Sequence, residues 1–225
     1  MAIGIFDSGL GGLTVVAEIK KVQPRADLVY LGDTARVPYG SRSPETIIKF
    51  SLECANFLMN QGVECIVIAC NTASAYALET IKKSINIPVY DVITPAKIEA
   101  TKYLNVGVIG TKATIKSGAY SVPGRACPLL VPLVEEGEIT GEIAEAVVKK
   151  YLQGFDVEAL ILGCTHYPYL IDVISKYTNA KLINPGECLA RNLPKFEGVG
   201  KEKYYVTDLT ESFLAKGLMT ERVII

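Results

Sequence analysis

The feature that most constrains the fold is a regular alternation of short apolar runs with amphipathic or alanine-rich segments along nearly the whole chain. The apolar runs have the length of buried strands, and the segments between them have the length and pattern of helices. Such alternation is typical of α/β proteins with mainly parallel sheets. We expect strands at residues 2–6, 28–32, 64–69, 88–92, 105–110, 128–133, 158–162 and 180–184. We expect helices at residues 12–22, 44–60, 72–83, 95–103, 112–120, 138–152, 168–177, 186–192 and 208–217.

The chain also contains a weak internal repeat. "VECIVIACNT" (63–72) and "VEALILGCTH" (157–166) share Val-Glu, four strand residues and a cysteine, and the Val-to-Cys distance is seven positions in both. "AIGIFDSG" (2–9) and "NVGVIGTK" (105–112) look like equivalent opening strands. Two α/β halves facing each other would bring Cys70 and Cys164 to one crevice. The repeat is short, and a length of 225 residues also leaves a single large domain open.

Composition excludes several classes of protein. Hydrophobic residues make up 49% of the chain and charged residues 21%, which is enough apolar material for a real core. The net charge of −1 gives no basic surface for a nucleic acid. The apolar runs are strand-sized, too short to span a bilayer. The opening "MAIGIFDSGLGG" has no basic region or cleavage site of a signal peptide, so we expect a soluble, cytoplasmic protein.

The cysteines are expected to be free thiols. No C-x-x-C pair occurs, and a single histidine is too few for the usual zinc patterns, so we predict no metal site. Without a secretion signal a disulfide framework is not expected. Free cysteines are most often small buried hydrophobes, which is our interpretation of Cys54 in a helical pattern and Cys65 in a strand. Cys127 and Cys188 give no clear signal.

Cys70 and Cys164 lie in a different setting, where an apolar strand gives way to a helix. Open α/β sheets bind ligands at the carboxyl ends of their strands, and a helix N-terminus favours a thiolate. A buried structural thiol would be the ordinary interpretation of a cysteine at either position. Two cysteines in matched settings favour a functional pair instead.

His166, the only histidine, stands two positions after Cys164. It could be an ordinary buried histidine, or it could pair with the thiol because its pKa lies near physiological pH. A cysteine hydrolase would use Cys164 and His166 in this way. Residues two apart on a turn rarely meet in the required geometry, however, and a hydrolase leaves Cys70 without a role.

Polar loops follow other strand ends. In "FDSGLGGLT" (6–14), Asp7 and Ser8 end a strand before a glycine-rich turn that is neither a P-loop nor a G-x-G-x-x-G motif. Asp7 could act in acid–base chemistry or bind an ammonium group, while the glycines could serve only the turn. Tyr39 and Gly40, in the loop "GDTARVPYGSRSPET" (32–46), could present backbone N–H groups to an anion. The neutral donors beside the two thiols, which suit a carboxylate, are Asn71, Thr72 and Thr165.

Two facing thiols can invert a stereocentre without a redox cofactor. One thiolate removes a proton from one face of a carbon, and the other thiol delivers a proton to the opposite face. Because a free cysteine has a pKa of about 8.5, a modest shift leaves one of the two ionised near neutrality. Donors on the substrate carboxylate and exclusion of water would support the proton abstraction.

The motifs "GIFDSGLGGLTV", "YLGDTARVPYG", "VIACNTASA", "GVIGTKATIKSGAY", "ACPLLVPLVEEG" and "LILGCTHYPYL" together resemble the glutamate racemase family, within the aspartate/glutamate racemases. The match runs in order over about residues 4–170. It implies a cofactor-independent enzyme that interconverts L- and D-glutamate and supplies D-glutamate for peptidoglycan. It also implies two pseudo-symmetric α/β domains with the active site in the crevice between them, often in a homodimer. We place the domains at residues 1–93 plus 186–225 and at residues 94–185.

The resemblance also implies roles for individual residues. Cys70 and Cys164 match the acid/base thiols, working on the D- and the L-enantiomer respectively. Asp7 and His166 match the groups that assist them, with Glu135, otherwise an ordinary surface charge, supporting His166. The positions that match substrate-binding residues are Asp7, Ser8, Tyr39, Gly40, Asn71, Thr72, Thr165 and His166. The chain departs from the family in a short connection at residues 121–125 and in Thr94-Pro95-Ala96.

Three functions therefore remain as hypotheses. A racemase, of glutamate or of the related aspartate, needs both thiols and exchanges the α-hydrogen of its substrate. A thiol hydrolase using Cys164 and His166 would stay active in Cys70→Ser and would form an acyl intermediate. A silent amino-acid-binding module would bind its ligand without hydrogen exchange.

Overall fold

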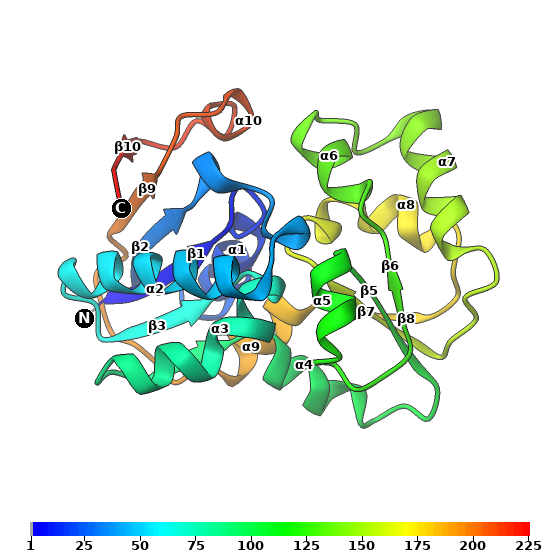
Figure 1. The fold of residues 1–225 in the computed structure, drawn as a ribbon, viewed down its shortest axis with the longest axis horizontal. Helices are drawn as coiled ribbons and strands as arrows, with labels where there is room; N and C mark the ends of the chain where they lie inside the picture. Colours follow the sequence, from blue (N-terminus) through cyan, green and yellow to red (C-terminus); the bar gives the residue numbers. More distant parts are fainter. Residues whose placement is uncertain (1) are drawn as a thin grey trace.

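The computed structural model describes residues 2–225 and contains two parallel sheets, each covered by helices (Figure 1). The first sheet has the strand order β10-β9-β2-β1-β3-β4, and the second has the order β6-β5-β7-β8. The strands of the first sheet are β1 (Ala2–Asp7), β2 (Asp27–Gly32), β3 (Cys65–Ile68), β4 (Val89–Asp91), β9 (Glu202–Val206) and β10 (Thr220–Arg222). Those of the second sheet are β5 (Val106–Gly110), β6 (Gly124–Ala126), β7 (Ala159–Gly163) and β8 (Lys181–Ile183). The prediction of an α/β fold with parallel sheets is confirmed.

The pseudo-symmetry expected from the repeat is visible in the strand order. The order β2-β1-β3-β4 in the first sheet recurs as β6-β5-β7-β8 in the second. The strands that the repeat made equivalent, β1 with β5 and β3 with β7, occupy corresponding places. Cys70 and Cys164 therefore follow equivalent strands.

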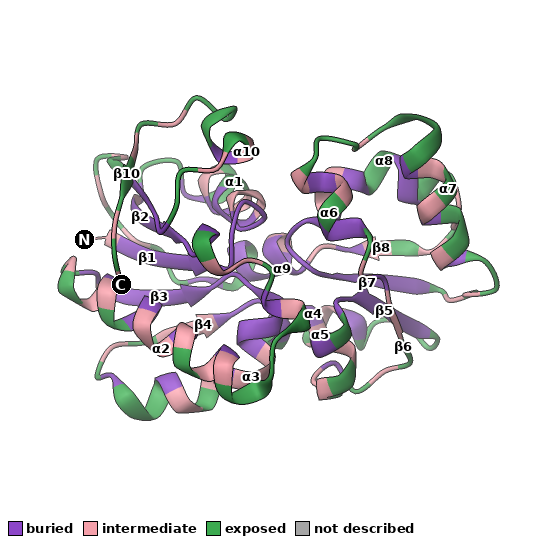
Figure 2. Cartoon of the chain, turned by 45° about the horizontal axis from the view of Figure 1, so that its top comes forward, coloured by how far each residue is buried: buried purple, intermediate pink, exposed green. Residues whose placement is uncertain are grey.

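Helices cover both faces of both sheets (Figure 2). On the first sheet, α1 and α9 pack on one face, and α2 and α3 on the other. On the second sheet, α6, α7 and α8 share one face, and α4 lies on the other. The helices are α1 (Leu13–Val22), α2 (Pro44–Asn60), α3 (Asn71–Ser84), α4 (Ile93–Ala100), α5 (Lys112–Ser117), α6 (Leu130–Glu135), α7 (Gly141–Leu152), α8 (Ile171–Ser175), α9 (Pro185–Asn192) and α10 (Glu211–Leu214). Short 3-10 turns are η1 (Thr34–Arg36), η2 (Tyr39–Ser41) and η3 (Tyr167–Leu170).

The sheets bring particular loops together because their strands are parallel and in register. Asp7 at the end of β1 lies opposite Gly32 of β2, and Phe6 lies opposite Ile68 of β3. The loops that follow β1, β2 and β3 therefore leave the sheet at one edge. In the second sheet, Gly110 of β5 lies opposite Gly163 of β7, which brings the residues after these strands to one edge as well.

One predicted strand is wrong, and three strands were not predicted. Residues 128–133 form no strand: the edge strand β6 ends before them, and α6 begins at Leu130. Cys127 N still donates to Gly110 O at 2.8 Å, but Pro128 has no N–H with which to continue the ladder. The strands β6, β9 and β10 were not expected from the sequence. The expected helices at 208–217 and 168–177 are also shorter in the structure, as α10 and as η3 followed by α8.

The chain crosses from the first sheet to the second between β4 and β5 and returns between β8 and β9. Helix α9 contacts both α1 and α4 at this junction. The division at residues 93/94 and 185/186 stays a prediction. Within residues 2–225, no helix combines the length and the apolar character needed to cross a membrane.

Candidate active site

The two thiols singled out by the sequence line the same small cavity between the sheets. Cys70 precedes α3, and Cys164 follows β7; both are buried, at 5% and 7% exposure. The cavity measures about 20 Å³, room for a single water molecule. The other sequence-predicted residues that line it are Ser8, Tyr39, Gly40, Asn71, Thr72, Thr165 and His166.

Asp7 lies behind this cavity with its carboxylate fully buried. Its Oδ2 accepts a hydrogen bond from Gly9 N at 3.0 Å, and its Oδ1 accepts one from Thr165 Oγ1 at 3.1 Å. Burial raises the pKa of Asp7 above its usual value, although the nearby His166 and these hydrogen bonds act in the opposite direction. Asp7 is thus attached to the first sheet and held by a residue of the second.

His166 lies between Cys164 and Glu135. Its Nδ1 is 3.8 Å from Cys164 Sγ, and its Nε2 is 2.6 Å from Glu135 Oε1. Burial alone would lower the pKa of His166, but its contacts with Cys164 and Glu135 raise it to about 10. Burial alone would raise the pKa of Glu135, but the bond from His166 and one from Ser212 lower it. The pair is therefore an imidazolium and a carboxylate at neutral pH.

This contact corrects one expectation. Cys164 and His166, two residues apart, do meet, because the turn into η3 places both side chains on the cavity. Glu135, expected to be a solvated charge from its sequence alone, is partly buried against His166.

Cys70 is in a different electrostatic setting. Its Sγ donates to Ser8 Oγ at 3.7 Å. Burial and the charge of Asp7 raise the pKa of Cys70 to about 12, although a backbone hydrogen bond at Ala73 lowers it. The expectation that the N-terminus of α3 would lower this pKa below that of a free cysteine is wrong, because burial and Asp7 outweigh the helix. The surroundings of Cys70 therefore favour its neutral thiol form.

The loop carrying Tyr39 and Gly40 is held by a buried carboxylate that the sequence analysis did not single out. Tyr39 donates its hydroxyl to Asp33, which also accepts from Arg36 Nε at 2.6 Å and from Thr207 Oγ1 at 2.9 Å. Gly40 lies against the second sheet, since a Cβ there would be 2.4 Å from Thr111 Cβ. Asp33 therefore fixes the loop where the two sheets meet.

The glycine-rich turn after β1 is also shaped by contact between the sheets. A Cβ on Gly11 would lie 2.4 Å from Thr165 Oγ1 and 2.5 Å from His166 Nδ1. One on Gly12 would lie 2.4 Å from Asp7 Cβ. Neither glycine has a positive φ. These glycines therefore provide space for the side chains of Thr165, His166 and Asp7, beyond the turn function expected from the sequence.

Known proteins resemble this chain over nearly its whole length. The model of the Asp/Glu/Hydantoin racemase family matches residues 13–193. A glutamate racemase from Aquifex aeolicus is 50% identical over 99% of this chain and 96% of that relative. The chain belongs to the Asp/Glu/hydantoin racemase family. It is therefore a racemase, an isomerase.

Solved structures of racemases share the whole fold. The glutamate racemase of Thermus thermophilus, in complex with β-chloro-D-alanine, has a TM-score of 0.91 and 41% identity, covering 99% of this chain and 96% of that one. The glutamate racemase of Francisella tularensis, in complex with D-glutamate, has a TM-score of 0.92 and 39% identity, covering 99% and 97%. The prediction of the racemase fold with two facing sheets is confirmed.

Two residues that line the cavity were missed, Thr111 and Val131. The hydroxyls of Thr111 and Thr72 form a hydrogen bond at 3.0 Å. Pro38, which also lines the cavity, lies in the loop that the sequence singled out for Tyr39 and Gly40. The internal repeat held a signal for Thr111, because aligning residues 2–9 with 105–112 places it opposite Ser8. The same repeat aligns Asn71 with Thr165 and Thr72 with His166. The repeat thus aligns polar residues that line the cavity with one another, as well as the two thiols.

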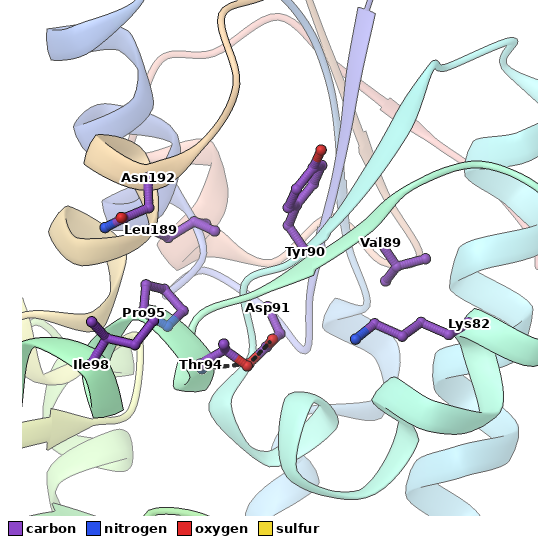
Figure 3. Close-up of a pocket in the computed structure, with 9 residues that line it drawn as sticks. All are labelled: Lys82, Val89, Tyr90, Asp91, Thr94, Pro95, Ile98, Leu189 and Asn192. Carbon is purple, nitrogen blue, oxygen red and sulfur yellow. Dashed lines mark hydrogen bonds between the residues drawn. The ribbon is translucent and has the colours of Figure 1, made fainter.

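A second, larger pocket of about 270 Å³ lies at the junction of β4, α4 and α9 and holds no predicted site residue (Figure 3). Its carboxylate, Asp91, already accepts bonds from Ile93 N at 2.8 Å and from Thr94 N and Oγ1 at 2.9 and 2.7 Å. Asp91 therefore orders the start of α4. Within residues 2–225, no group of three or more His, Cys, Asp or Glu side chains is arranged to hold a metal ion.

Proposed function

We propose that this racemase interconverts L- and D-glutamate by proton transfer between two thiols, without a cofactor. The observation that carries the proposal is that Cys70 and Cys164, at the ends of equivalent strands, line one cavity. A relative with 39% identity was solved with D-glutamate, which supports glutamate over aspartate as the substrate.

The two thiols have different surroundings, and we use these to assign the protonation state of each thiol before the reaction. The imidazolium of His166, 3.8 Å from Cys164 Sγ, is a counter-charge for a thiolate at Cys164. Asp7 and burial keep Cys70 protonated. Cys164 as thiolate would take the α-proton of L-glutamate, and the C–H electron pair would stay on Cα. Cys70 would then give its S–H proton to the opposite face, which leaves D-glutamate, a thiol at Cys164 and a thiolate at Cys70. D-glutamate would react by the same steps in reverse.

The remaining polar groups have roles in binding. Asn71, Thr72 and Thr165 offer neutral donors suited to carboxylates, and Asp7 offers a counter-charge to the ammonium group. The cavity of about 20 Å³ is far below the roughly 300 Å³ of small ligand pockets. Substrate entry therefore requires the two sheets to move apart, and closure around glutamate would exclude water.

The wider role follows from the family resemblance. D-glutamate would serve peptidoglycan synthesis, and the enzyme would work in the cytoplasm as a homodimer. These three points are predictions, as is the preference for glutamate over aspartate.

The test is incubation with L-glutamate in deuterated water without added cofactor. Proton NMR follows loss of the α-hydrogen signal, and a chiral assay follows D-glutamate. We expect both, with activity reduced by at least 10²-fold in Cys70→Ser and in Cys164→Ser. Cys188→Ser is the matched control, because Cys188 is equally buried at 7% exposure but lies outside the cavity.

The alternatives give different results. Activity on aspartate but not on glutamate would mean that the substrate of this racemase is aspartate. A hydrolase using Cys164 and His166, whose contact at 3.8 Å is present, would stay active in Cys70→Ser. Binding of glutamate without any hydrogen exchange would indicate a silent binding module.

A further inference from the structure

A hydroxyl from the end of the chain reaches across to the other sheet and contacts the active-site carboxylate. Ser212 Oγ, on α10, donates to Glu135 Oε2 at 2.9 Å. Helix α10 follows β9 of the first sheet, whereas Glu135 ends α6 on the second sheet, and Figure 1 shows α10 and α6 on facing sides. The two oxygens of Glu135 are thus divided, Oε1 to His166 and Oε2 to Ser212.

The position of Ser212 is fixed from within the first domain. Its neighbour Phe213 is fully buried and stacks on Tyr30, with ring centroids 6.2 Å apart. The hydroxyl of Tyr30 donates to Gly9 O at 2.6 Å, in the loop that carries Asp7. Phe213 therefore ties Ser212 to the part of the first sheet that forms the active site.

A second contact crosses the same boundary. Lys216 Nζ lies 4.8 Å from the ring centroid of Tyr169, which belongs to η3, the turn that directly follows His166. The positive charge of Lys216 also helps to lower the pKa of Glu135. The titratable groups around His166 and Glu135 include Cys164 and Tyr169 of the second domain, and Asp7, Tyr30 and Lys216 of the first.

We propose that Ser212 is a positioning residue: its hydroxyl, anchored through Phe213, holds the Glu135 carboxylate against His166 only when the two domains are closed. The proposal rests on the proposed function in one respect, that His166 assists Cys164. Ser212 is not one of the residues that line the cavity, and its hydroxyl forms hydrogen bonds with Glu135 and Thr210. Its effect on the reaction passes through Glu135 and His166.

The single histidine makes this testable without substrate. In protein labelled with ¹³C-histidine, one imidazole signal reports His166 alone. We expect Ser212→Ala to lower the titration midpoint of His166 by about one unit, because loss of one hydrogen bond frees Glu135 from this position. Ser212→Thr, which keeps the hydroxyl, should restore the wild-type midpoint. Ser84→Ala is the matched control, an exposed serine whose Oγ bonds only Thr80 O.

Kinetics provide the second measurement. Ser212→Ala should lower kcat/KM for glutamate by about tenfold. The decrease in kcat/KM must be the same for L-glutamate and for D-glutamate, because the two enantiomers have the same free energy. An unchanged or raised His166 midpoint in a folded Ser212→Ala protein would overturn the proposal. If the wild type does not racemise glutamate, the proposed function fails, while the titration still tests whether Ser212 positions Glu135.

Discussion

Thr165 Oγ1 donates a hydrogen bond to Asp7 Oδ1 at 3.1 Å, and this bond joins residues that follow β7 of the second sheet and end β1 of the first. One of the two proposed assisting groups is therefore oriented by the opposite half of the molecule. The same holds for Glu135, which accepts from Ser212. Each half of the site depends on the other for its geometry.

Replacing Thr165 with valine keeps the shape of the side chain and removes its hydroxyl. We expect the free energy of unfolding to fall by about 1–3 kcal/mol, because the buried Asp7 loses a hydrogen-bond donor. We expect kcat/KM to fall at least tenfold as well, because Asp7 is no longer held toward the cavity. Urea unfolding and steady-state kinetics measure the two effects. Thr165→Ser should behave like the wild type, and equal losses in both variants would contradict the role of the hydroxyl.

Gly11→Ala tests the close approach of the two domains. The new Cβ would lie 2.4 Å from Thr165 Oγ1 and 2.5 Å from His166 Nδ1, so the halves cannot close without displacing those side chains. A displacement of about 1 Å costs on the order of 10² in rate, and we expect a loss of that size in kcat. Gly124→Ala is the control, since its nearest contact is the flexible end of Ile115 at 3.0 Å. Wild-type activity in Gly11→Ala would show that closure is not needed.

His166 should make stability depend on pH. Its pKa is raised from 6.5 to about 10 in the folded protein, so folding favours the protonated form. The stabilisation is complete below about pH 6.5 and is lost as the pH rises toward 10, with a slope of at most about 1.4 kcal/mol per pH unit. Buried thiols with raised pKa values add to the loss only above about pH 8.5, where unfolded cysteines ionise.

The window between about pH 6.5 and 8.5 therefore isolates His166. Urea unfolding in this window should show declining stability in the wild type and a shallower decline in Glu135→Gln, because Glu135 is one of the groups that raise the pKa of His166. Glu138→Gln, at an exposed neighbouring position, should follow the wild type. Identical slopes in all three proteins would mean that Glu135 does not stabilise the imidazolium.

Asp7→Asn should make Cys70 easier to ionise. The charge of Asp7 adds to burial in raising the pKa of Cys70 to about 12, so its removal lowers that pKa. The pH dependence of iodoacetamide alkylation, followed on the Cys70 peptide by mass spectrometry, should shift to lower pH. Cys188 in the same molecules is the internal reference. Activity should fall by about 10²-fold, because the asparagine side chain carries no charge. An unshifted profile would mean that Asp7 does not act on Cys70.

Much of the fold could be predicted because buried parallel strands leave a strong local signal. The runs that became β1, β3, β5 and β7 are continuously apolar, and the Ser43-Pro44-Glu45 sequence marks the start of α2, where Ser43 Oγ accepts from Thr46 N at 3.3 Å. Edge strands leave a weaker signal. The strand expected at 128–133 is apolar because α6 packs into the core, and the prolines at 128 and 132 were the signs against a strand.

The two thiols could be predicted because Cys164 directly follows β7 and Cys70 stands two residues after β3. The contacts between the two halves of the molecule could not be predicted from the sequence. Gly11 against His166, Asp33 beneath Tyr39, and Ser212 on Glu135 join residues whose proximity is set by tertiary packing. The raised pKa of Cys70 also depends on burial, whereas the sequence showed only the start of a helix.

The order of strands in the first sheet has a consequence for how the chain folds as it is synthesised. Strand β2 pairs with β1 along one edge and with β9 along the other, with Tyr30 opposite Tyr204. All of the second sheet is made between β2 and β9. While the second half is being translated, Leu28–Gly32 therefore presents an unpaired, apolar edge of the kind on which chains aggregate. Strand β9 is made after the whole second sheet and covers this edge, so a ribosome that stalls before β9 would release a chain prone to aggregation.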